Sequence, residues 1–129
     1  EPEFKGIEQT DIVKPGLKES VVRLRIHFYN PNKSSITLRS ASGEAWADGD
    51  YLGSFSMDST MQIAGLSDFE LPVLFTADMK TVLKSSLGAL SGTDAELKIE
   101  GTARVKKGIL KLGVPIRYTG KHNMAELLQ

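Results

Sequence analysis

The stretch that decides the fold runs from residue 21 to residue 32 and reads Val-Val-Arg-Leu-Arg-Ile-His-Phe-Tyr-Asn-Pro-Asn. Apolar and polar side chains alternate in it with the period of two that is typical of a β-strand with one buried face. The inward set comprises Val22, Leu24, Ile26 and Phe28. Asn30-Pro31-Asn32 then ends the strand, because proline has no N–H for a ladder and asparagine side chains hydrogen-bond local backbone in turns. The stretch therefore predicts a strand followed by a turn.

Further strands are expected on both sides of this segment. Residues 4–13 predict an edge strand, closed by Lys14-Pro15-Gly16, and a third strand carries Ile36 and Leu38 on one face. Asp48-Gly49-Asp50 separates two apolar runs, at residues 45–47 and 51–55, and such a turn indicates a hairpin between a fourth and a fifth strand. The orientation of Trp46, beside that turn, stays open at this point.

The second half of the chain predicts three more strands and one helix. Residues 69–75 alternate around Pro72, which favours a sheet edge or a bulge because proline cannot complete a ladder. The closing hairpin turns at Lys106-Lys107-Gly108, and its alternation predicts one inward set: Leu97, Ile99, Gly101, Ala103, Val105, Leu110, Leu112, Val114, Ile116 and Tyr118.

Between these strands, apolar residues recur at intervals of three and four, as in a helix: Met79, Val82, Leu83, Leu87 and Leu90. Asp78 fits an N-cap, and Gly88 or Gly92 could end the helix. We expect its apolar stripe to cover an open end or side of the sheets. A membrane-surface helix is the less favoured alternative, because only Lys80 and Lys84 supply a basic face.

The pattern as a whole predicts an all-β protein. We expect one domain over residues 1–129, an antiparallel β-sandwich of seven or eight strands with one short helix between the sixth strand and the final hairpin. Residues 120–129 are expected to form a tail, of which residues 124–129 are helical or frayed.

Composition excludes several classes of function. The charges of the 16 basic and 16 acidic side chains cancel, which argues against a nucleic-acid-binding protein and a polybasic membrane anchor. Local basic patches are still compatible with a net charge of zero. There is no cysteine, so disulfides and zinc–thiolate sites are excluded. No apolar run approaches the roughly 20 residues of a membrane span. The start at Glu1-Pro2-Glu3 suggests a mature or trimmed chain with any targeting segment outside it.

The sequence offers little catalytic chemistry, and no cofactor is expected. His27 and His122 are the only histidines, and neither has a second ligand at metal-binding spacing. Asp48-Gly49-Asp50 lacks the further oxygen ligands of a calcium loop, and nucleophile-elbow and phosphate-loop motifs are absent. We therefore expect a protein that is not an enzyme. A site assembled only in the fold, such as His27 with a carboxylate, is the alternative.

One surface patch is a candidate for binding. Arg23, Arg25 and His27 share the outer face of their strand and could form a face for an anionic ligand. The favoured interpretation is a solvated sheet face, with Glu44, Glu100 and similar residues as cross-strand partners.

The order of landmarks resembles the late-embryogenesis-abundant type 2 family, also called the water-stress and hypersensitive-response domain. The resemblance covers nearly the whole chain and rests on the order and spacing of five segments: Asp11-Ile12-Val13, Asn30-Pro31-Asn32, residues 45–53, residues 69–73 and residues 114–120. Asn30, Pro31 and Asn32 are its most recognisable positions, and physically they are expected to be turn determinants.

The resemblance implies a fibronectin-III-like sandwich without enzymatic activity, associated with desiccation and other stress. It also implies a place in the cell envelope or periplasm, since similar bacterial proteins are often lipoproteins anchored by a cysteine upstream. The expected function is protection of other envelope components under water or osmotic stress. The alternative is a module that binds a glycan, lipid or protein through a sheet face, loops or a cleft under the helix.

Overall fold

The computed structural model describes residues 3–57, 59–90, 92 and 94–122. One helix, α1 (Met79–Leu90), lies between the sixth strand and the final hairpin, as the sequence predicted. The strands are β1 (Glu3–Lys14), β2 (Glu19–Asn30), β3 (Ile36–Ala47), β4 (Asp50–Met57), β5 (Met61–Ile63), β6 (Ser67–Asp78), β7 (Ala95–Lys107) and β8 (Leu110–His122). Every strand pairing is antiparallel, so the predicted fold class is confirmed.

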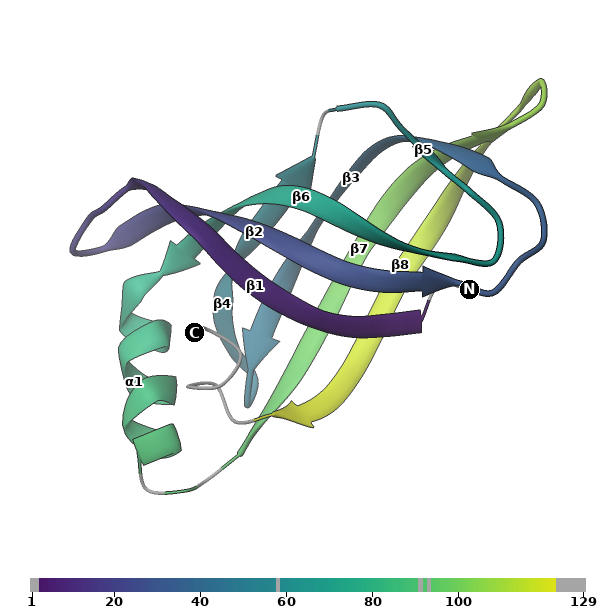
Figure 1. Cartoon of the computed structure of the whole chain (residues 1–129). Coiled ribbons are helices and arrows are strands. Elements are labelled where there is room, and N and C mark those ends of the chain that lie inside the picture. Colours follow the sequence, from purple (N-terminus) through teal and green to yellow (C-terminus); the bar gives the residue numbers. More distant parts are fainter. Residues whose placement is uncertain (1–2, 58, 91, 93, 123–129) are drawn as a thin grey trace.

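The strands form one curled sheet in the order β1-β2-β6-β4-β3-β7-β8, with β5 beside β3. In Figure 1, β1, β2 and β6 cross over β3, β7 and β8, which gives the two layers of a sandwich. The layers are joined through β4, which pairs with β6 only between Gly53–Ala77 and Ser56–Leu74. β1 ends the strand order, which confirms the predicted edge strand.

The third and fourth predicted strands are one continuous strand, β3. The polar segment Arg39-Ser40-Ala41-Ser42-Gly43 suggested an interruption, yet it contains only a register shift between Leu38 and Ser40. Leu38 and Ala41, on either side of that shift, are both buried. The short strand β5 was not predicted at all. Its three residues pair with Ile36–Leu38 of β3. A strand of three residues is too short to show a recognisable alternation of apolar and polar side chains.

Turn chemistry fixes the hairpin between β3 and β4. Asp48 and Gly49 both have positive φ, at 49° and 83°, as a two-residue type I′ turn requires. Trp46 lies between Ala45 and Ala47, which are 4% and 2% exposed. Since neighbouring side chains in a strand point to opposite faces, Trp46 faces outward.

The core consists of two clusters between the layers. The larger one contains Leu24, Leu38, Ala41, Met57, Ile63, Val73 and Val105. The smaller one contains Ala45, Ala47, Leu52, Ala95 and Leu97. Most inward sets predicted from alternation therefore do reach the core.

Pro72 lies in a part of β6 that has a strand on one side only. It is opposite Arg25 of β2, whereas β4 pairs with β6 only from Leu74 to Ala77. The missing N–H of proline is tolerated at such a local edge. The predicted edge position is thus confirmed, although β6 as a whole lies inside the sheet.

Helix α1 begins as the sequence predicted. Asp78 Oδ1 accepts hydrogen bonds from the backbone N–H groups of Lys80 (3.1 Å) and Thr81 (3.2 Å), which is N-cap geometry. Gly92, with φ of 79°, follows the last turn, whereas Gly88 lies within the helix. A hydrogen bond from Lys84 Nζ to Asp50 Oδ2 (2.7 Å), together with the negative charge of Asp50, raises the pKa of Lys84 and ties α1 to β4.

The predicted apolar stripe of α1 is only partly buried. Val82 packs against the smaller core cluster and Thr81 is 8% exposed, whereas Leu83, Leu87 and Leu90 are exposed. The expectation that the whole stripe covers the sheets was wrong. The side of the helix that carries Thr81 and Val82 packs toward the strands. Helical spacing identifies the apolar stripe, but it does not determine which part of a broad stripe is buried.

Two expectations for the end of the chain also change. Leu110 and Leu112 share the face of Val114 and Ile116, but they are 61% and 50% exposed. Residues 120–122, expected in the tail, belong to β8. The predicted structure of the rest of that tail falls outside the described residues.

Candidate functional site

The outer face of β2 carries the basic row that the sequence singled out. Arg23, Arg25 and His27 lie on this face, between β1 and β6. In the strand register Arg25 is opposite Glu8 of β1, and His27 is opposite Glu70 of β6. Strand order therefore brings acidic side chains from distant parts of the sequence to both sides of the row.

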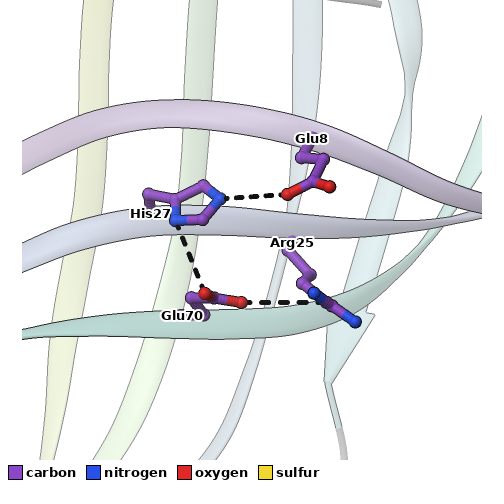
Figure 2. Close-up of polar contacts among 4 residues, drawn as sticks. All are labelled: Glu8, Arg25, His27 and Glu70. Carbon is purple, nitrogen blue, oxygen red and sulfur yellow. Dashed lines mark ion pairs between the residues drawn. The ribbon is translucent and has the colours of Figure 1, made fainter. Parts of the chain in front are cut away.

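Figure 2 shows His27 between two carboxylates. His27 Nε2 lies 3.5 Å from Glu8 Oε2, and His27 Nδ1 lies 3.8 Å from Glu70 Oε1. The other carboxylate oxygen of Glu70 lies 3.7 Å from Arg25 Nε. All four side chains are between 37% and 54% exposed. We call these four residues the His27 cluster.

The His27 cluster has the properties of a solvated ion-pair network. Its two carboxylates offset the positive charge of Arg25, so these residues do not present an unopposed cationic face. The distances exceed those of good hydrogen bonds, and exposed ion pairs contribute about 0–1 kcal/mol. Cross-strand acidic partners were expected here, but they are Glu8 and Glu70.

The two partners named from the sequence lie elsewhere. Glu44 and Glu100 face each other on β3 and β7, in the other layer. The Nζ atom of Lys98 lies 2.9 Å from Glu100 Oε1 and offsets its charge. The sequence alone does not show which acidic residues lie beside the basic row, because the order of strands in the sheet decides which strands are neighbours.

A half-open hollow of about 440 Å³ adjoins His27. Its lining comprises Lys5, His27, Phe28, Asp68, Phe69 and Glu70. The rings of Phe28 and Phe69 stack with their centroids 5.5 Å apart. None of the six lining residues is a serine, threonine or cysteine that could act as a nucleophile. The hollow can receive a small polar group, and His27 does lie beside carboxylates as the enzyme alternative requires.

A second group of side chains lies on the outer face of the other layer and was not singled out from the sequence as a site. The rings of Trp46 and Tyr51 meet edge to face, with centroids 6.4 Å apart. Lys98 Nζ lies 5.4 Å from the centre of the Trp46 ring. Tyr51 is 40% exposed. The signal available in the sequence was the small residue on each side of Trp46, which predicts a crowded inner face and an outward tryptophan.

The segment Asn30-Pro31-Asn32 joins two turns. Asn30 is 2% exposed, and its Nδ2 donates a hydrogen bond to the Ala64 carbonyl oxygen (3.0 Å). Its Oδ1 accepts one from the backbone N–H of Asn32 (3.1 Å). The backbone N–H of Leu66 donates to the Asn32 carbonyl oxygen (2.9 Å). Asn30 thus connects the turn after β2 to the turn before β6.

Across residues 3–57, 59–90, 92 and 94–122, no group of three or more His, Cys, Asp or Glu side chains could hold a metal ion. No helix in these ranges has the length and apolar character needed to cross a membrane.

Comparison with known proteins supports the fold. No protein-family model and no curated protein matches this sequence. The structure is similar to a crystal structure of a protein from Archaeoglobus fulgidus, with a TM-score of 0.54 and 7% sequence identity over 93% of this chain and 96% of that one. It is also similar to the solution structure of AT1g01470 from Arabidopsis thaliana, with a TM-score of 0.60 and 10% identity over 94% of this chain and 79% of that one. Both sequence identities are low, so these similarities show a shared fold and nothing more.

Proposed function

We propose that this protein is a non-enzymatic domain that protects other components of the cell envelope during desiccation or osmotic stress. Two observations support the proposal: the sequence resembles the late-embryogenesis-abundant type 2 family, and the fold is similar to the two structures described above over more than nine-tenths of the chain. The surface supports it, because exposed charges of both signs lie side by side, as in the His27 cluster. Such a surface favours solubility and keeps large apolar patches few.

The proposed mechanism needs only a stable, wet surface. The domain stays folded as water is withdrawn, lies between neighbouring proteins and keeps their apolar surfaces apart. A lipid anchor upstream of Glu1, of the kind found in bacterial lipoproteins, would hold it in the envelope. Fractionation of the native source tests this location: recovery in the envelope fraction supports it, and recovery in the cytosol contradicts it.

Drying a labile reporter enzyme tests the protective function. The enzyme is dried with this protein or with an equal mass of an inert globular protein, and its activity is measured after rehydration. We expect clearly higher recovery with this protein. Recovery equal to that with the inert protein would refute direct protection of soluble proteins.

A second candidate function rests on Trp46 and Tyr51. An aromatic ring bounded by charged groups suits a sugar, which has an apolar C–H face and a polar rim, and aromatic rings supply large contact areas at binding sites. Lys98 and Glu100 would bind the hydroxyl groups. Trp46 is the only tryptophan, so its fluorescence reports binding directly. Saturable quenching by a polysaccharide, lost in Tyr51→Ala but kept in Tyr29→Ala, would support glycan binding, because both variants keep the Trp46 reporter.

A further inference from the structure

The turn end of the β7–β8 hairpin exposes large apolar side chains. Ile109 is 94% exposed, Leu110 61% and Leu112 50%. Residue 112 is opposite Val105, which is 7% exposed and belongs to the larger core cluster. The core therefore ends at Val105, and the hairpin continues past it, as the projecting loop at the upper right of Figure 1 shows. We call residues 104–112 the hairpin tip.

The hairpin tip is also strongly basic. It contains Arg104, Lys106, Lys107 and Lys111, all exposed. Residues 101–125 hold six basic residues and no acidic one, which leaves ten basic against sixteen acidic residues in the rest of the chain. Although the net charge of the protein is zero, the charges are unevenly distributed along the sequence, because residues 101–125 carry only basic side chains.

The geometry places the two properties together. Lys106 and Lys111 are opposite each other on one face of the hairpin, whereas Leu110 and Leu112 point to the other face. Lys107 is opposite Leu110, and Gly108–Ile109 form the turn between the strands. The apolar side chains at the apex therefore adjoin Lys107 on their own face and Lys106 and Lys111 on the other.

We propose that the hairpin tip binds the surface of an anionic lipid bilayer. Ile109, Leu110 and Leu112 enter the boundary between headgroups and acyl chains, and the lysines contact the anionic headgroups. This combination of apolar anchor and basic surround is what interfacial membrane binding requires. A nucleic-acid surface would match the cations but would leave three apolar side chains without apolar contacts.

Another exposed apolar turn provides a matched control. Leu17, between β1 and β2, is 99% exposed and is flanked by Lys14 and Lys18. However, acidic residues adjoin it, since Glu19 and Asp78 are opposite each other where β2 meets β6. Leu17 is about as exposed as Ile109, but only the hairpin tip lacks acidic residues in its own sequence segment.

Cosedimentation of the full chain with vesicles tests the proposal. The vesicles contain phosphatidylcholine alone or phosphatidylcholine with phosphatidylglycerol. We expect binding to the anionic vesicles only, weakening as salt is added. Replacing Lys106, Lys107 and Lys111 by glutamine should lower the partition coefficient by about fivefold for each lysine. The double variant Ile109→Asp with Leu110→Asp should lower it at least about tenfold, and Leu17→Asp should change it less than about twofold.

Each alternative outcome contradicts the proposal. Equal binding to both kinds of vesicle, or no binding to either, would overturn it. So would Leu17→Asp if it lowered binding as much as the double tip variant does. Circular dichroism confirms that the variants fold, which is expected because the altered side chains are exposed. The drying experiment contains no lipid, so its failure and the failure of this proposal are distinguishable.

Discussion

Replacing Gly43 with valine is expected to destabilise the protein by about 3 kcal/mol, the upper part of the range for overpacked cores. Gly43 lies on the inner face of β3, opposite Gly101 of β7 and Phe55 of β4. A Cβ atom at residue 43 would lie 2.4 Å from the Glu100 carbonyl oxygen and 2.6 Å from Cζ of Phe55. The Phe55 ring fills the space that a side chain would need, so the strands must separate or the ring must move.

Urea denaturation measures this effect, and Gly113→Val is the control. Gly113 also lies in a strand, but a Cβ there meets only Thr102 Cγ2, at 3.8 Å. We expect Gly113→Val to leave the free energy of unfolding unchanged or to raise it by up to about 1 kcal/mol. If Gly43→Val does not fold, Gly43→Ala provides the smaller perturbation. Equal stability of the two valine variants would contradict the packing described for β3 and β4.

Replacing Asn30 with alanine should cost about 2 kcal/mol of the free energy of unfolding. The change removes two part-buried hydrogen bonds, one to the Ala64 carbonyl oxygen and one from the Asn32 N–H. The Ala64 carbonyl oxygen keeps the hydrogen bond from Ser67 Oγ (2.8 Å). Each intramolecular hydrogen bond contributes about 0.5–1.5 kcal/mol to stability, so two of them account for the expected loss. For a domain of this size the melting temperature should fall by roughly 10 °C.

Asn32→Ala is the matched control for that substitution. Asn32 is exposed, and the contacts described for it use its backbone N–H and carbonyl groups, which alanine retains. We expect a change of less than about 0.5 kcal/mol. If Asn32→Ala is as damaging as Asn30→Ala, the connection between the two turns does not depend on the Asn30 side chain.

Local signals explain why much of the fold was predictable. Alternation identified the long strands, Asp48-Gly49 identified the hairpin, and Asp78 identified the start of the helix. Each signal acts within a few residues. The same reasoning missed the continuity of β3, because the serines and glycine after Leu38 have a loop-like composition and a register shift between Leu38 and Ser40 breaks the alternation.

What depends on distant segments was not predictable in the same way. Alternation places Leu110 and Leu112 on one face, but it does not state that the core ends at Val105. Similarly, the row containing Arg25 and His27 was visible, whereas Glu8 and Glu70 become its neighbours only through the order β1-β2-β6. The sequence indicates which residues share a face, and the strand order determines what that face meets.

The protective function requires above all that the domain remain folded when dry. Infrared spectroscopy of the amide I band, recorded in solution and in a dried film, tests this requirement most directly. We predict the same antiparallel β-sheet band in both states, and a loss of that band on drying for the destabilised variant Asn30→Ala. Conversion of the unaltered protein to a disordered or intermolecular β-sheet band on drying would contradict the account.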